Sequence, residues 1–436
     1  MSVTTEKQSF SQDLIASAEL SQFTEATASR EKAFEDFKLV GLPDGKHEEY
    51  KFAPITKLLA KNFNADELYS KPTASNNDLS SLIPKGLGEN CVVFVNGVYN
   101  KSLSKIKNTS KVVIKSFVEA LESHLHVVTE GLTEIAESKD PFALLNSALW
   151  QDGLFIHVPA KATGEEPLYI YHLHDATEKK VASHTRLMVV VEKHAEFSII
   201  ERTDSLGKHP VFNTINEEIL VDENAVFSYC KIQDDHGDLI HVGNTTVHQK
   251  KSSRADTYTI SLNGKLVRNN LSIIIDGEGC ESHFYGLYMT DGDTLVDNHT
   301  TVDHRKPNSF SNELYKGLMD GKSKGVFNGK IYVRPDAQKT NAFQSNRNIL
   351  LSDTATINTK PQLEIWADDV KCSHGCTTGQ LDGEALFYLQ SRGIPKDTAR
   401  AMLLYAFAGE VIDAIKDEHV KNYVDSIVSE RLHKSY

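Results

Sequence analysis

The chain has 436 residues, of which 40% are hydrophobic and 25% charged, values typical of a soluble globular protein. Its formal net charge of −13 disfavours nucleic acid or an anionic membrane as the main target. Five cysteines are too few for a disulfide framework, residues 1–10 lack the apolar core of a signal peptide, and no apolar run is long enough to span a membrane. These features predict a reduced, cytoplasmic protein of about two or three domains.

Residues 1–150 are predicted to form a mainly helical N-terminal domain. Phe10, Leu14 and Ala18 recur at spacings of four, which places them on one face of a helix. The pair Asp140-Pro141 is typical of a helix start, because proline is tolerated at the first helical position.

Residues 151–380 are predicted to form a repetitive β-domain, because helical periodicity vanishes and short apolar strands alternate with Gly, Asn and Asp turns. The segment Val191–Ser198 recurs as Val221–Ser228. Looser repeats, at steps of 26 to 30 residues, begin at Val247, Ile275 and Val302. Such steps match one coil of a β-helix, in which each coil covers the next. The final coil would leave an open edge that invites aggregation or a partner strand.

Residues 381–436 are predicted to form a C-terminal helical domain. Gly393 stands where a left-handed helix stop is expected, and Pro395 then begins a longer helix. The apolar residues of this helix include Met402, Phe407 and Val411, at steps typical of an amphipathic helix. The pattern leaves two alternatives open: the helices pack on the β-domain, or they dock a partner.

The segment Cys372-Ser373-His374-Gly375-Cys376 places metal-ligand residue types at alternate positions. In an extended strand Cys372, His374 and Cys376 share one face, about 7 Å apart from one to the next. A flat strand cannot close a tetrahedral site by itself, so further ligands would have to come from elsewhere, for example from another chain. The alternative is two packed cysteines and a hydrogen-bonded histidine. Packing is also the expectation for Cys91, Cys230 and Cys280.

Two other segments resemble functional motifs only in part. Gly317–Ser323 is one residue short of a phosphate-binding loop and lies outside any βαβ unit, so we interpret it as a turn and predict no ATP on this chain. His299 and His304 are five residues apart and would face opposite sides of one strand. We therefore expect hydrogen-bonded strand residues there and not a metal site.

The tract Asn358–Gly375 resembles the signature of the SufB/SufD family. Further matching segments are Asp297–His304, Leu314–Gly317, Val326–Gly329, Gly379–Asp382 and Phe387–Ile394. Near the N-terminus, His47–Phe52 is similar to an acidic-aromatic-lysine stretch of such proteins. The motif Cys-Ser-His-Gly, followed by Phe-Tyr-Leu-x-Ser-Arg-Gly, resembles the sequences of the SufD branch of the family.

This resemblance implies a right-handed parallel β-helix between N-terminal and C-terminal helical segments. It implies a non-catalytic scaffold subunit of a SufBCD-type complex that assembles iron–sulfur clusters. A SufB-like paralogue would pair through the open edge of the β-helix, and a SufC-like ABC-type ATPase would dock on the C-terminal helices. Homodimer formation without the paralogue, and participation of a flavin in the complex, are left open.

Within the family, the histidine of Cys-Ser-His-Gly is implicated as a ligand of a transient iron–sulfur cluster shared with SufB. Carried over, this metal ligand is His374, with Cys372 and Cys376 as further candidate cluster-binding residues. SufD proteins commonly have a small residue at the position of Cys376, so its thiol adds a ligand, holds sulfur transiently or only fills space.

Two alternative functions are a stand-alone metal-binding regulator, which would use the same three residues, and a carbohydrate-active β-helix enzyme. The absence of a signal peptide and the reduced cysteines disfavour the enzyme.

Overall fold

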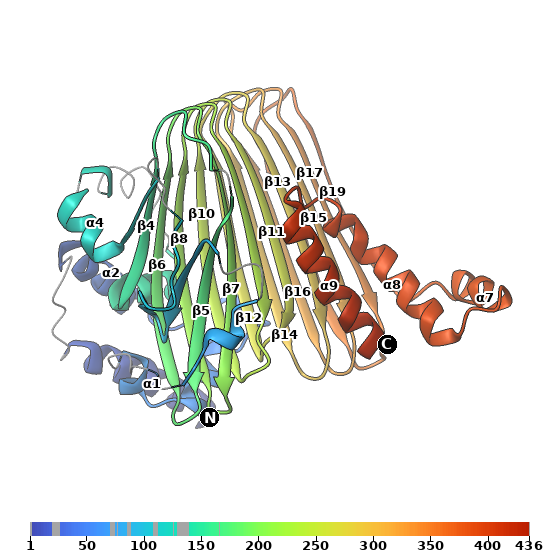
Figure 1. Cartoon of the computed structure of the whole chain (residues 1–436), viewed down its shortest axis with the longest axis horizontal. Coiled ribbons are helices and arrows are strands. Elements are labelled where there is room, and N and C mark those ends of the chain that lie inside the picture. The colour runs from blue at the N-terminus through green and yellow to red at the C-terminus, as the bar shows by residue number, and fades with distance from the viewer. Residues whose placement is uncertain are drawn as a thin grey trace.

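The computed structural model describes residues 2–19, 27–69, 75, 77–84, 89–107, 112–124, 126–128 and 139–435. Its centre is a parallel β-solenoid with helices before and after it, as predicted (Figure 1). The helices are α1 (Ser2–Glu19), α2 (Thr27–Val40), α3 (Ile55–Asn62), α4 (Phe117–Ser123), α6 (Pro141–Leu149), α7 (Gly383–Ser391), α8 (Lys396–Ile412) and α9 (Glu418–Ser435). No helix within these ranges has the length and apolar character needed to cross a membrane.

Successive strands alternate between two sheets that face each other across the solenoid. Sheet A contains β2 (Val98–Tyr99), β1 (Cys91–Val95), β5 (Leu168–Ala176), β7 (Glu196–Gly207), β9 (Val226–Asp234), β11 (Arg254–Asn263), β13 (Glu281–Thr290), β15 (Phe310–Met319), β17 (Asn341–Leu350) and β19 (Lys371–Gly379). Sheet B contains β3 (Val113–Ser116), β4 (Asp152–Val158), β6 (Val181–Val191), β8 (Val211–Val221), β10 (Leu239–Gln249), β12 (Leu266–Ile275), β14 (Leu295–His304), β16 (Lys324–Val333) and β18 (Thr356–Ile365).

The sequence repeat corresponds to the coils. Val191 pairs with Val221 in sheet B, and Phe197 pairs with Phe227 in sheet A. The looser repeats at Val247 and Val302 begin two residues before the positions that are in register with Val221, which are Gln249 and His304. A shift of two residues keeps a side chain on the same face of a strand, so the alternating pattern does not reveal it.

Six tight turns from sheet B to sheet A, from the β6–β7 turn to the β16–β17 turn, each contain one residue with a left-handed backbone. These residues are His194, Asn224, Ser252, Gly279, Asn308 and Lys339, with φ between 57° and 71°. Each donates its N–H to a carbonyl of the next coil; Asn224, for example, donates to Lys251 at 3.0 Å. Glycine and asparagine adopt this conformation at low cost, and the stacked turns continue the hydrogen bonding of the sheets.

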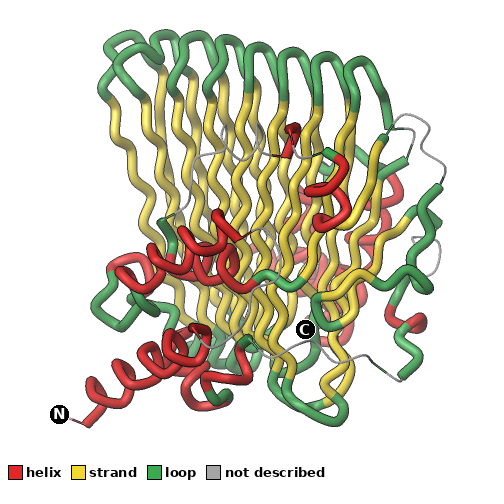
Figure 2. The backbone as a smooth tube through the Cα atoms, turned by 90° about the vertical axis from the view of Figure 1, so that its left-hand side faces the viewer, coloured by secondary structure: helices red, strands yellow, loops and turns green. Residues whose placement is uncertain are grey.

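Three apolar layers hold the domain together. Side chains such as Val191, Ile219 and Phe227 fill the space between the two sheets. The outer face of sheet B is covered by the N-terminal helices, with Leu14 and Phe212 in one buried cluster (Figure 2). The outer face of sheet A is covered by α8 and α9 (Figure 1).

The C-terminal helices pack on the β-domain, which is the first of the two alternatives, and the buried face of α8 includes only part of the predicted stripe. Leu404, Ala408 and Val411 of α8 are buried against sheet A, whereas Met402 is 47% exposed. Steps of four and three along this face follow the helical repeat, so Met402, two residues before Leu404, lies on another side. The helix starts where predicted, because Pro395 precedes it as the N-cap.

The region before residue 150 contains strands as well as the predicted helices. Leu14 and Ala18 of α1 are buried, and α6 begins at Pro141 with the Asp140 carboxylate accepting backbone N–H groups. However, β1, β2 and β3 already belong to the two sheets. Short strands at a sheet edge carry little periodicity, which is why the helical pattern dominated the sequence.

The two ends of the solenoid differ. At the N-terminal end, β2 and β3 close the sheets with antiparallel pairing. At the other end, within the described chain, β18 pairs only with β16 and β19 only with β17. Every residue of β6 is buried, but no residue of β19 is. The last coil is therefore an open rim.

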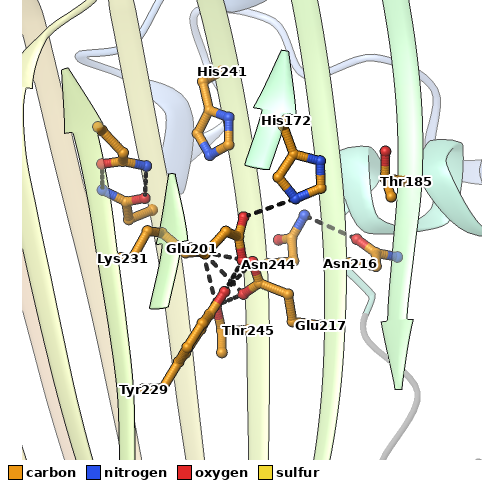
Figure 3. Close-up of polar contacts among 12 residues, drawn as sticks. His172, Thr185, Glu201, Asn216, Glu217, Tyr229, Lys231, His241, Asn244 and Thr245 are labelled. Carbon is orange, nitrogen blue, oxygen red and sulfur yellow. Dashed lines mark hydrogen bonds and ion pairs between the residues drawn. The ribbon is translucent and has the colours of Figure 1, made fainter. Parts of the chain in front are cut away.

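A cluster of polar side chains, among them Glu201, Glu217 and Lys231, lies inside the solenoid (Figure 3). The Lys231 ammonium donates to Glu217 at 2.9 Å, and the Tyr229 hydroxyl donates to Glu217 at 2.8 Å and to Glu201. His172 Nε2 lies 3.4 Å from Glu201. All five side chains are at most 5% exposed. Buried charges require such partners, because an unpaired ion inside a protein is strongly disfavoured.

The two carboxyl groups of this cluster titrate in opposite directions. Burial, reinforced by the charge of Glu201, raises the pKa of Glu217 to about 8. Burial also pushes the pKa of Glu201 upward, but the Lys231 charge and hydrogen bonds from His172 and Tyr229 outweigh it, so this pKa is lowered. Glu201 and Glu217, which lie beside Lys231, therefore hold one proton between them near neutral pH, mainly on Glu217.

This arrangement predicts a pH-dependent effect of Glu217→Gln. The folded-state pKa of Glu217 is raised from 4.5 to about 8, so the folded protein binds the extra proton and its free energy of unfolding falls as pH rises through that window. Relative to wild type, Glu217→Gln should gain on the order of 1–3 kcal/mol between pH 5 and pH 9. Urea unfolding at the two pH values measures this change.

Glu218→Gln is the matched control, because Glu218 faces outward on the same strand and pairs with Arg186. A difference between Glu217→Gln and wild type that stays constant with pH would contradict the assignment of the buried proton to this carboxyl.

Candidate functional site

The three candidate ligands lie on β19 and face the interior of the solenoid at its open rim. Cys372, His374 and Cys376 are in register with Ala342, Gln344 and Asn346 of β17. Those three β17 residues are fully or nearly fully buried, which fixes the inward direction of this face. The prediction that alternate residues of the motif share one face is confirmed.

Position in the last coil decides the exposure of the three side chains. Cys372 is half-buried and packs against the interior core, and burial raises the pKa of its thiol. His374 and Cys376 are exposed. Within the described part of the chain no coil follows β19, so inward-facing groups that would be covered elsewhere remain accessible here.

Directly behind the rim lies a pair of buried polar side chains that the sequence did not single out. Gln344 Nε2 donates to Glu313 Oε2 at 2.8 Å, and the two residues are in register on β17 and β15. Burial raises the pKa of Glu313 to about 7. Only the coil register could have revealed this pair, because Gln344 precedes His374 by one full coil and Glu313 precedes it by two.

The rim suits a shared ligand site. Imidazole nitrogen and thiolate sulfur both bind iron, and thiolates are the usual ligands of iron–sulfur clusters. Consecutive inward side chains of one strand are about 7 Å apart, which is too far for three of them to converge. Among the described residues, no group of three or more His, Cys, Asp or Glu side chains is placed to hold a metal ion.

The remaining sequence candidates have structural roles. Gly317–Ser323 spans the end of β15 and the turn into β16, with no helix after it. His304 faces inward and bonds Ser311 at 2.9 Å, whereas His299 faces outward beside Asp297 at 2.9 Å. The expectation that these histidines face opposite ways is confirmed. The three other cysteines are buried, as expected: Cys91, Cys230 and Cys280.

The segment His47–Phe52 lies over the outer face of sheet B, away from the inward face of β19. Its Glu49 carboxylate contacts His299 at 3.2 Å and Lys330 at 2.6 Å. The hydrogen bond from His299, together with Lys330, lowers the pKa of Glu49 to about 2. A groove of about 560 Å³ lies beside this segment, with Phe52 and Lys360 among its lining residues. With further contacts to β12 and β18, the segment fastens the N-terminal region to four successive coils of the solenoid.

Comparison with known proteins gives consistent matches over nearly the whole chain. The model "SufBD protein N-terminal region" matches residues 9–170, and "SUF system FeS cluster assembly, SufBD core domain" matches residues 172–407. An iron–sulfur cluster assembly SufBD family protein of Synechocystis is 34% identical over 383 residues, 86% of this chain and 84% of that protein.

Two relatives carry the name iron–sulfur cluster assembly protein SufD. The protein of Escherichia coli K12 is 31% identical over 394 residues, 90% of each chain. The protein of Bacillus subtilis 168 is 28% identical over 348 residues, 76% of each chain. The core model alone covers more than half of the sequence and includes the rim strand with its Cys-Ser-His-Gly motif. The chain belongs to the SufB/SufD family of iron–sulfur cluster assembly proteins.

Proposed function

We propose that this chain is a non-catalytic scaffold subunit of a SufBCD-type complex, in which His374 and a SufB-like paralogue together hold a nascent iron–sulfur cluster. The observation that carries the proposal is the open rim. It combines an unpaired strand edge with an exposed imidazole on the inward face. The cluster is cargo here, assembled from iron and sulfur and then passed on.

The pairing surface is the free edge of β18 and β19. Each strand has a neighbour on one side only within the described chain, so its outer backbone N–H and C=O groups remain available. A strand from another solenoid can add to such an edge and satisfy them. A second copy of this chain offers the same edge, which supports homodimer formation when the paralogue is missing.

The cluster site follows from this pairing. A partner strand across the rim would place its own side chains opposite His374 and Cys376, and so would supply the ligands that β19 alone cannot bring together. A mixed set of imidazole and thiolate ligands should hold a cluster less firmly than four thiolates. That difference suits a cluster that has to be released to an apoprotein.

The surface proposed for the SufC-like ATPase is the side of the C-terminal helices that does not face the solenoid. Met402 and Tyr405 of α8 are 47% and 39% exposed, and Phe387 and Tyr388 of α7 are 72% and 56% exposed. No residue of α7 is buried, and this helix projects beyond the solenoid (Figure 1). Exposed aromatic and methionine side chains are enriched in protein interfaces.

The first prediction concerns His374→Ala. Because His374 is exposed, the variant should fold and pair with the paralogue as wild type does. Its complex should carry about tenfold less cluster, since a ligand is lost. Co-purification with untagged partners, followed by iron, sulfide and visible-absorption analysis, measures the yield.

Ser373→Ala is the control for this variant, because Ser373 is adjacent and faces the other side of β19. Normal cluster content in the His374→Ala complex would exclude the ligand role. Stoichiometric metal on the isolated chain would instead favour a stand-alone metal-binding regulator.

A second prediction tests the thiol of Cys376. If this thiol takes part in cluster binding, Cys376→Ala should shorten the lifetime of the cluster on the purified complex several-fold, with complex formation unchanged. Iron and sulfide content followed over time gives the rate of loss. Thr377→Ala, next to it on the outward face, controls for disturbance of the strand. Identical retention in Cys376→Ala and wild type would leave this thiol a space-filling role.

A third prediction tests the docking surface. Met402→Asp places a charge on the exposed side of α8, so ATPase binding should weaken about tenfold or more while pairing with the paralogue is kept. Leu39→Asp is the matched control, because Leu39 is an exposed apolar residue on α2, at 86% exposure. Separate pull-downs of the two partners decide the outcome, and unchanged ATPase capture would reject this surface.

A further inference from the structure

The amide of Gln344 is held rigidly behind the rim. Its side chain is 3% exposed, and its Nε2 donates to Glu313 Oε2 at 2.8 Å. Across the interior, Gly329 of β16 leaves the space that the amide occupies, since a Cβ at that position would lie 2.2 Å from Nε2. The missing side chain of Gly329 therefore makes room for the amide on one side. The Glu313 carboxylate accepts from Nε2 and so orients the nitrogen end of the amide toward itself.

The other end of this amide lacks a partner. Gln344 Oε1 is buried and accepts no hydrogen bond from any described residue. Leaving a buried carbonyl oxygen unsatisfied is unfavourable, so this acceptor calls for a donor. Above the Glu313 pKa of about 7 the ionised carboxylate only accepts hydrogen bonds, so the amide then keeps its Nε2 toward Glu313.

A candidate donor for this oxygen is His374. It is in register with Gln344 on the adjacent strand and on the same inward face. Neighbouring strands lie about 4.8 Å apart, so an imidazole N–H can reach the amide oxygen of the residue beside it. A metal-bound histidine usually donates its second ring N–H to a carbonyl or carboxylate, which fixes its tautomer and orientation.

We propose that Gln344 is a positioning residue for His374: its Oε1 accepts a hydrogen bond from one ring nitrogen, and the other nitrogen keeps its lone pair toward the open rim for iron. This inference rests on the proposed function, since it assigns the partner of the proposed ligand. Glu313 acts one step further back by keeping the amide oxygen directed at β19.

The test begins with the tautomer of His374 in the full chain without metal or partner. Long-range 15N–1H spectra of 15N-histidine-labelled protein at pH 8.5, above the ordinary histidine pKa of about 6.5, report which ring nitrogen carries the proton. The His374→Ala spectrum assigns the signal. The tautomer ratio of His374 should differ about fivefold or more from that of a Ser-His-Gly peptide. A ratio equal to that of the peptide overturns the proposal.

Variants then identify the acceptor. Gln344→Leu removes the oxygen at similar volume, and its His374 ratio should return to the peptide value. Gln344→Glu keeps an acceptor and should retain a single dominant tautomer. Ser345→Ala, on the outward face of β17, should leave the wild-type spectrum unchanged. A wild-type ratio in Gln344→Leu contradicts the inference, and the wild-type measurement decides it even if this variant folds poorly.

Cluster retention separates this inference from the proposed function. In the assembled complex, Gln344→Leu should lose cluster about 10–100-fold faster than wild type, the usual effect of removing the partner of a ligating histidine. If His374→Ala carries normal cluster, the ligand role fails whatever the tautomer. If His374→Ala lacks cluster but Gln344→Leu changes neither tautomer nor retention, only the role of Gln344 is rejected.

Discussion

Hydrogen bonding between successive coils is the interaction on which the whole structure depends. The backbone N–H and C=O groups of each inner strand pair with the coil before it and the coil after it. The hydrogen bonds of the left-handed turns continue this pairing between coils. Such an arrangement has no natural stopping point, because every finished coil presents a fresh edge to the next. The chain closes one end with antiparallel strands and leaves the other end open. Exposed backbone and exposed ligand-type side chains coincide at that open end.

The interior adds a second constraint. A solenoid lined only with apolar residues would slide easily between registers, because neighbouring positions would be nearly equivalent. Here charged and amide side chains such as Glu217 and Lys231 have specific partners on other strands, so a shift of one coil position would leave buried charges unpaired. Nearer the rim, a separate interior row runs through Glu313 and Gln344 to His374. Buried polar side chains thus also form the surroundings of the rim site.

The sequence predicted the arrangement of the candidate ligands but not the residues that surround them. Alternation within the Cys372–Cys376 segment was enough to place its three ligand types on one face, because the two-residue period of a strand is a local property. The sequence did not indicate the Gln344 amide, because Gln344 lies one full coil before His374 and only the strand register brings the two together. For a similar reason the sequence did not separate Met402, which is exposed, from Val411, which is buried against sheet A. Several apolar residues were compatible with helical spacing, and only contact with sheet A selected among them.

By itself, the sequence determined the parallel solenoid between helical segments, the length of its coils, the common face of the candidate ligands and the family to which the chain belongs. All of these follow from local periodicity or from contiguous motifs. The tertiary structure decided that this common face points into the interior, that it lies in the last coil of the described solenoid, and that Gln344 stands behind His374. These facts depend on how many coils are stacked and in which register, and backbone pairing between residues some 30 positions apart fixes both.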